Sequence, residues 1–180
     1  YMVCMLLVSI IPLLGQLLPV ILVPIFSVAF AQGCLNIDQG KRVAEWVIAN
    51  HQGDGKIIEL EGTTGSSPAN DRKKGFDDAI AADSRFTILE SRSGDFARDE
   101  GRKVMETLLQ AHPDVKGVIC GNGPVALGAI AALKAAGRND VIVVGIDGSN
   151  DERDAVKAGT LKATVMLQAQ AIAAQGFELD

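Results

Sequence analysis

Charge is absent from the amino-terminal part of this 180-residue chain, where no Asp, Glu, Lys or Arg precedes Asp38. All 17 basic and 22 acidic side chains therefore lie from residue 38 onward, and the net charge is −5. The chain also lacks a cluster of lysine and arginine. Nucleic acids and anionic membrane surfaces attract proteins through a basic face, so the composition argues against both as electrostatic partners.

Metal ligands and nucleophiles are scarce as well. Three scattered cysteines and two histidines do not provide the closely spaced, paired ligands of a zinc site, and the sequence leaves open whether Cys34 and Cys120 pair. No G-x-S-x-G elbow occurs. The adjacent carboxylates are expected to be charges on helix surfaces: Asp77 with Asp78, and Asp151 with Glu152. We therefore expect no metal, no cofactor and no enzymatic activity.

Residues 1–34 form an apolar leader, in which only seven of the first 31 residues fall outside the hydrophobic set. The run is long enough to span a membrane, although its three prolines each remove a helical hydrogen bond. It ends in Ala29-Phe30-Ala31, an A-x-A arrangement typical of a signal-peptide cleavage site. We expect a signal peptide cut after Ala31. A retained membrane anchor and a non-native segment, such as a frameshift or fusion, are the alternatives.

From residue 35 to residue 180, short β-rich runs alternate with amphipathic stretches of helical period. This pattern predicts an α/β domain with a parallel sheet flanked by helices. The expected strands are Lys56–Leu60, Phe86–Leu89, Val115–Cys120, Val141–Ile146 and Ala163–Met166. The expected helices are Asp38–Asn50, Ala69–Ala82, Phe96–Ala111, Pro124–Ala136, Glu152–Ala158 and Ala169–Phe177.

Polar residues follow each expected strand, at the edge where parallel sheets bind ligands. The hydroxyl-rich loop Glu61–Arg72 comes after the first strand. From the loop alone, Ser67 or Asn70 is expected to cap the helix that follows it, and Arg72 is expected to be solvated. Phe96 stands at a helix start, where it either stacks on a ligand or staples the helix. Asp147 is the acidic residue of the run Gly145-Ile-Asp-Gly148 at a strand end. Its carboxylate suits the recognition of hydroxyl groups.

The run Gly121-Asn-Gly-Pro-Val-Ala126 also satisfies the dinucleotide-binding pattern G-x-G-x-x-A, with Asp147 placed as a ribose-binding acid. A dinucleotide-binding enzyme is thus an alternative function. The glycines alternatively serve only a tight turn, with Pro124 in the first helical turn. Fluorescence titration with NADH distinguishes these alternatives, since saturable binding that is lost in Asp147→Ala would favour the enzyme.

Four ordered motifs resemble the ribose and galactofuranose group of periplasmic sugar-binding proteins. They are Glu59-Leu-Glu-Gly-Thr-Thr-Gly-Ser-Ser-Pro-Ala-Asn-Asp-Arg-Lys-Lys-Gly-Phe76, Ser93-Gly-Asp-Phe-Ala-Arg98, Asn122 before Ala-Leu-Gly-Ala129, and Val141-Ile-Val-Val-Gly-Ile-Asp-Gly148. The resemblance runs from about Asn36 to Asp180. It implies a two-lobed receptor that closes on a monosaccharide and delivers it to the membrane subunits of an ABC importer.

The resemblance also implies the ligand-binding residues. Arg72 would donate to sugar hydroxyls, Phe96 would pack on the sugar face, and Asn122 would both donate and accept. Asp147 would accept from two hydroxyls, and Gln168 is matched to a glutamine contact near the hinge. A set of this kind suits a neutral polyol, because each hydroxyl both donates and accepts.

Two departures from the family pattern matter. Gly123-Pro124 stands where the family usually has an acidic residue after the Asn, so polar support for Asn122 is expected to be lost. Asn36–Gly40 resembles the point at which the family chain first crosses into its second lobe, so we expect only that lobe, in residues 35–180, with weak sugar binding. The expected location is periplasmic. A membrane-tethered sugar sensor is the alternative if the leader is retained.

Overall fold

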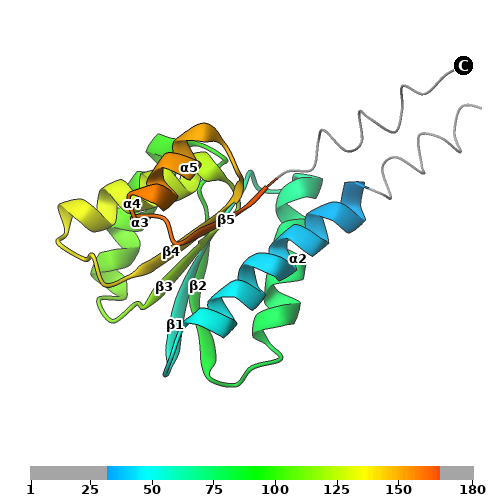
Figure 1. The fold of residues 1–180 in the computed structure, drawn as a ribbon, viewed down its shortest axis with the longest axis horizontal. Coiled ribbons are helices and arrows are strands. Elements are labelled where there is room, and N and C mark those ends of the chain that lie inside the picture. The colour runs from blue at the N-terminus through cyan, green and yellow to red at the C-terminus, as the bar shows by residue number, and fades with distance from the viewer. Residues whose placement is uncertain (1–31, 167–180) are drawn as a thin grey trace, which may run out of the picture. The chain divides into compact units, whose positions relative to one another are not determined.

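The computed structural model describes residues 32–166, and Figure 1 shows a sheet with helices on both of its faces. The strands are β1 (Gly55–Glu61), β2 (Phe86–Ser93), β3 (Gly117–Cys120), β4 (Ile142–Asp147) and β5 (Ala163–Met166). All neighbouring pairs are parallel, in the order β2-β1-β3-β4-β5. The expected parallel α/β fold is confirmed.

The helices that connect the strands are α2 (Ser67–Ile80), α3 (Arg98–Ala111), α4 (Gly123–Ala135) and α5 (Asn150–Lys157). A first helix precedes β1 and ends at residue 50 as expected, but it is already helical at residue 32. The expected helix Ala169–Phe177 lies outside the described residues. Strand β2 is longer than expected. It is a half-exposed strand at the edge of the sheet, so it includes polar residues that the pattern of a buried strand does not predict.

Alternating strand residues build two apolar cores, one on each face of the sheet. Ile57 of β1 packs with Val43 and Val47 of the first helix and with Phe76 of α2. On the opposite face, strand residues pack against α3 and α4: Ile58, Leu60, Val118, Cys120 and Val143. Figure 1 shows the same division, with the first helix and α2 on one side and α3 and α4 on the other.

Glycines let the helices of each layer approach to backbone contact. A Cβ on Gly40 of the first helix would lie 2.0 Å from the carbonyl oxygen of Arg72 in α2, and a Cβ on Gly75 of α2 would lie 1.9 Å from that of Ile37. Both distances are far shorter than a van der Waals contact. No larger residue fits at either position without separating the two helices.

Glycines also bring α3 and α4 into backbone contact on the other face of the sheet. A Cβ on Gly101 of α3 would lie 2.9 Å from the Val125 carbonyl oxygen in α4, and a Cβ on Gly128 of α4 would lie 2.1 Å from that of Arg98 in α3. These contacts bring together the first turns of α3 and α4. Both turns begin at the carboxyl ends of strands, where ligands of parallel sheets bind.

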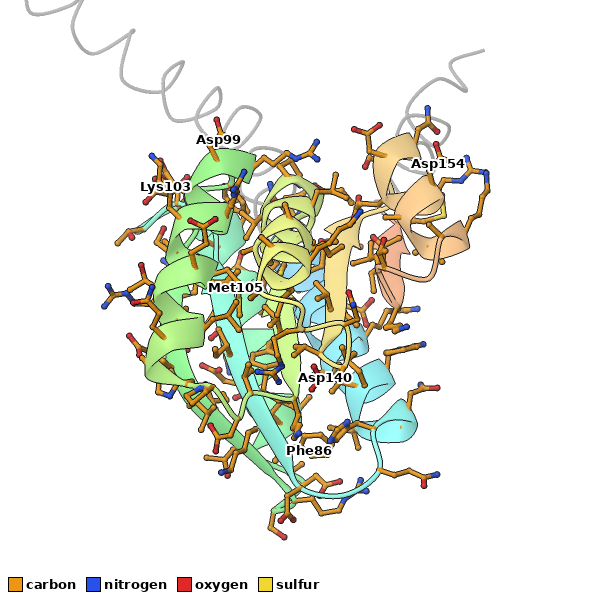
Figure 2. All side chains as sticks on the ribbon, turned by 90° about the vertical axis from the view of Figure 1, so that its left-hand side faces the viewer. Phe86, Asp99, Lys103, Met105, Asp140 and Asp154 are labelled. Atoms are coloured by element: carbon orange, nitrogen blue, oxygen red, sulfur yellow. The ribbon has the colours of Figure 1, made fainter. Side chains whose placement is uncertain are left out.

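Figure 2 places labelled residues at the two ends of the sheet. Asp99 of α3 and Asp154 of α5 lie at the carboxyl ends of the strands, whereas Phe86 and Asp140, which introduce β2 and β4, lie at the amino ends. Met105 points from α3 into the core. Of the helices that are described, none has both the length and the hydropathy needed to cross a bilayer.

The glycine contact between the first helix and α2 predicts a specific loss of stability. Gly75→Ala should lower the free energy of unfolding by about 1–3 kcal/mol, because the new methyl group meets backbone atoms that cannot rotate away. Urea unfolding measures this. Gly117→Ala in β3 is the matched control, since the nearest atom to its Cβ would be 3.7 Å away. Equal stability of the two variants would contradict the assignment.

Candidate functional site

Arg72 lies in the amino-terminal half of α2 and is almost entirely buried, with 9% of its surface exposed, so the expectation that it is solvated was wrong. Its Nη1 donates to the carbonyl oxygen of Gly121 at 2.6 Å, and its Nη2 lies 3.7 Å from Oδ1 of Asp147. Burial lowers the pKa of Arg72, whereas the nearby carboxylates of Asp147 and Glu152 raise it. An arginine remains protonated at neutral pH, so the site contains a fixed cation.

The turn of α2 that carries Arg72 is anchored to the sheet by its neighbour. Lys73 Nζ lies 2.6 Å from Oε2 of Glu59, a β1 carboxylate whose side chain is 5% exposed. Ser91 of β2 donates to the same oxygen at 2.7 Å. Burial raises the pKa of Glu59, and the bonds from Lys73 and Ser91 oppose this. The ion pair fixes the position of α2 against β1 at the residue next to Arg72.

Asp147 ends β4 with an unusual backbone, because its φ is +129° although it is not a glycine. Such a conformation costs of order 1–3 kcal/mol and persists only where neighbouring contacts hold it. Oδ2 accepts the backbone N–H of Gly123 at 3.2 Å. Burial is the largest influence and raises the pKa of Asp147. The Gly123 N–H and then Arg72 lower it, and Glu152 adds to the rise.

Asn122 is the N-cap of α4 and is 7% exposed. Its Oδ1 accepts the N–H of Val125 at 3.1 Å, and its Nδ2 donates to the carbonyl oxygen of Phe96 at 3.2 Å. Asn122 therefore has polar partners in spite of Gly123, contrary to the expectation that its support is lost. These bonds couple the first turn of α4 to the loop that carries Phe96.

Phe96 sits between β2 and α3 with a φ of +54°, and its ring lies on the backbone of Gly62. A Cβ on Gly62 would lie 2.0 Å from the ring. The guanidinium carbon of Arg72 is 5.9 Å from the ring centroid, a cation–π distance. A hydrophobic staple would need an apolar side chain four residues into α3, and Gly101 stands there. Phe96 therefore does not act as a hydrophobic staple of α3.

Arg72, Phe96, Asn122 and Asp147 therefore meet at one edge of the sheet, and we refer to these four residues as the strand-end site. They come from α2, the β2–α3 loop, the α4 cap and β4. The fifth residue expected from the family resemblance, Gln168, lies outside the described residues. The expected caps of α2 were wrong, because Ser66 is the N-cap and its hydroxyl donates to the Thr63 carbonyl.

The cavity next to the strand-end site is small. The cavity lined by Gly62, Arg72 and Gly121 measures only about 10 Å³. A larger hollow of about 140 Å³ lies at the amino ends of the strands, between the end of α4 and the residues before β5. Arg138, which lines this hollow, is already bonded to Asp140 and to the carbonyl oxygens of Pro113 and Val115.

One prediction about the charged residues was wrong. Asp77, Asp78 and Asp151 are surface charges as expected, but Glu152 is completely buried. It lies behind the strand-end site, where a Cβ on Gly123 would be 2.5 Å from its carboxylate. The spacing Ser149-x-x-Glu152 identifies a capping box, and that signal was available in the sequence. The burial of Glu152 was not predictable from the sequence, because it depends on how closely α4 and β5 approach α5.

The described cysteines are the remaining candidates for chemistry. Within residues 32–166, Cys34 and Cys120 form no disulfide. Cys34 is exposed, whereas burial raises the pKa of the Cys120 thiol, so that the Cys120 thiolate is not available. Within residues 32–166, no three His, Cys, Asp or Glu side chains are grouped to hold a metal ion.

The geometry of α4 also argues against a dinucleotide site. A pyrophosphate would need free N–H groups at the start of this helix. Asp147 and Asn122 already accept those of Gly123 and Val125. The carboxylates of Asp147 and Glu152 would moreover repel a pyrophosphate.

The raised pKa of Asp147 predicts a pH-dependent stability. The folded state holds the proton more tightly than the unfolded chain, so stability falls as pH rises from the ordinary Asp value of 3.8 through the higher folded value. Asp147→Asn removes the buried charge and keeps an acceptor for Gly123. We expect it to raise the free energy of unfolding by about 0.5–2 kcal/mol near pH 7.

Urea unfolding at two pH values checks this prediction. The gain should disappear near pH 3, where the wild-type carboxyl is also protonated in both states. Asp154→Asn on α5 is the control, because its side chain is 76% exposed and its surface pair with Lys157 contributes little. A gain that is equal at both pH values would show that the buried charge is not its cause.

Comparison with known proteins supports the resemblance seen in the sequence. Residues 26–179 match the family model described as periplasmic binding protein domain. The chain is 46% identical to the ribose import binding protein of Salmonella typhimurium over 141 residues, which are 78% of this chain and 47% of that protein. It thus spans about half the length of this relative.

Solved structures of periplasmic binding proteins also resemble this chain. The arabinose-transporter binding protein of Shewanella sp. ANA-3, bound to α- and β-L-arabinofuranose, superposes with a TM-score of 0.71 at 36% identity, covering 73% of this chain and 45% of that one. The fructose-binding periplasmic domain of a hybrid two-component system gives 0.72 at 30% identity, with 78% and 48% covered. These relatives are binding proteins, which confirms the expectation of a non-enzymatic chain. The chain belongs to the periplasmic binding protein domain family.

Proposed function

We propose that this chain contributes one lobe of a monosaccharide receptor for an ABC importer, with the strand-end site as its share of the sugar contacts. The observation that carries the proposal is the pairing of Arg72 with Asp147. Their nearest atoms are 3.7 Å apart, which is too far for a hydrogen bond. Each group therefore keeps bonding capacity for a hydroxyl that accepts from the guanidinium and donates to the carboxylate.

The aromatic ring completes the chemistry of a sugar site. Phe96 is half-buried and lies beside Arg72, so its ring offers an apolar surface next to polar groups. Sugars present an apolar face of C–H groups as well as hydroxyls, and an aromatic side chain suits that face. Asn122 Nδ2 carries a second hydrogen in addition to the one it donates to Phe96.

Charge favours a neutral ligand. Arg72 is the single cation in the strand-end site, and the carboxylate of Asp147 balances it. Glu152 adds a further acidic group behind the strand-end site. A phosphorylated or carboxylated sugar would meet net negative charge here, whereas a free pentose or hexose would not. We therefore assign a neutral monosaccharide as the ligand class.

The other functional assignments follow from this receptor role. The partners are the membrane subunits of the importer, the location is the periplasm, and residues 1–34 act in export. Gln168 adds a contact near the hinge. A receptor lobe alone covers one side of its ligand, and affinity in such proteins grows with the surface that is buried. We accordingly expect the affinity of this chain to be weak.

A second candidate function is a membrane-tethered sugar sensor. It is favoured by the similarity to the fructose-binding domain of a two-component system. The two roles share the strand-end site and differ in the fate of the leader. Mass spectrometry of the protein isolated from its source cells distinguishes them, because an importer receptor should begin at Gln32 and a tethered sensor should retain the apolar segment.

Sugar binding can be tested by following backbone amide resonances in NMR titrations with D-ribose, L-arabinose and D-fructose. We expect saturable shifts at Phe96, Gly123 and Asp147 with a dissociation constant above about 1 μM. Arg72→Gln should weaken binding at least about tenfold, because the buried charged donor is lost. Ribose 5-phosphate should produce no saturable shift at these amides.

Arg102→Gln is the matched control. Arg102 is an exposed residue of α3 whose partner is Glu106 in the same helix, so its loss should leave sugar affinity unchanged. Submicromolar affinity would disprove the expectation of weak binding. The absence of any saturable shift with a wider panel of pentoses and hexoses would disprove the sugar-binding function itself.

A further inference from the structure

Glu152 has a degree of burial that helix capping does not require. It is 0% exposed, and its partners among residues 32–166 are neutral. Oε2 accepts the N–H and the hydroxyl of Ser149 at 2.9 and 3.0 Å, and Oε1 accepts the hydroxyl of Thr164 at 2.7 Å. An exposed Glu would complete the same capping box without the cost of burying a carboxylate. The burial therefore calls for another explanation.

The bonds of Glu152 converge on the backbone that follows Asp147. Glu152 holds the N–H of Ser149 directly. The hydroxyl of Thr164, which donates to Glu152, accepts the N–H of Gly148 at 3.2 Å. Both peptide groups after Asp147 are thus attached to a single carboxylate. They lie where the chain turns through φ values of +129° at Asp147 and +70° at Gly148.

The same carboxylate also limits the position of α4. A Cβ on Gly123 would lie 2.5 Å from both Cδ and Oε2 of Glu152, so the helix terminus rests directly against it. The N–H of Gly123 donates to Asp147 Oδ2 at 3.2 Å. Residue 123 and the acid at residue 152 therefore compete for one volume. Glu152 occupies it and leaves room only for a glycine.

We propose that Glu152 is a positioning residue, which orients the sugar-binding carboxylate of Asp147 by fixing Gly148 and Ser149 on one side and Gly123 on the other. It has no exposed surface and does not contact ligand. It links α5, β5 and the first turn of α4 behind the strand-end site. The effect on affinity rests on the proposed sugar-binding function, whereas the effect on the Asp147 backbone does not.

Variants of Thr164 and Glu152 test the proposal with the sugar that binds in the titrations above. Thr164→Val and Glu152→Gln should each weaken binding about tenfold and shift the amide resonances of Gly148 and Ser149 in the ligand-free protein. Thr164→Ser keeps the hydroxyl and should restore both readouts. Asp154→Asn, an exposed acid on the same helix, should change neither.

A lower melting temperature with unchanged affinity and unchanged Gly148 and Ser149 resonances would assign Glu152 a purely structural role and overturn the proposal. If the wild-type chain binds no sugar, the proposed function fails on its own. The amide shifts then still decide whether Glu152 positions Asp147.

A second experiment tests whether side chains at positions 123 and 152 compete for the same space. Gly123→Asp and Glu152→Gly should each weaken binding, because the first creates a clash and the second removes the acid. The double variant places the acid on α4 and clears the space on α5. We expect its affinity to lie within about threefold of wild type, well above the product of the single effects. Strictly additive losses would contradict the competition for one volume.

Discussion

Backbone contact between paired helices is the constraint on which the site depends. Gly40 and Gly75 seat the first helix against α2, and Gly101 and Gly128 seat α3 against α4. In each layer the contact lies within one or two turns of a site residue. Arg72 supplies the carbonyl that Gly40 meets, and Val125, which Gly101 meets, is capped by Asn122. Because the helices cannot separate or slide without losing these contacts, the groups at their ends are held in a defined arrangement.

The opposed charges of buried Arg72 and partly buried Asp147 are held on this scaffold at a cost to stability. Arg72 and Asp147 face each other without a hydrogen bond, and the Nε of Arg72 is buried without a partner among the described residues. Unsatisfied groups of this kind cost about 1–3 kcal/mol each. A structure selected only for stability would pair or remove them. Their retention, together with the strained backbone of Asp95, Phe96 and Asp147, is what we expect if a ligand supplies the missing bonds at the proposed sugar site.

The strands were largely predictable because each is short and apolar on one or both sides, and because a helix follows each of β1 to β4. The expected β5 matched residue for residue, and the other strands differed mainly at their ends. Strand β2 was underestimated because its polar half faces solvent at the edge of the sheet. The tight glycine contacts were not predictable, since a glycine inside a helical pattern shows that a close approach is possible but not which partner makes it.

The amino-acid sequence by itself determined the alternation that yields a parallel sheet and the identity of the polar residues at the strand ends. Local pattern suffices for this, because side-chain direction has a fixed period in strands and helices. Only the tertiary structure decided which of these residues meet. The approach of Arg72 to Asp147 spans 75 residues of chain, and the burial of Glu152 depends on how closely α4 and β5 approach α5. Those distances are set by packing between elements, which no local pattern encodes.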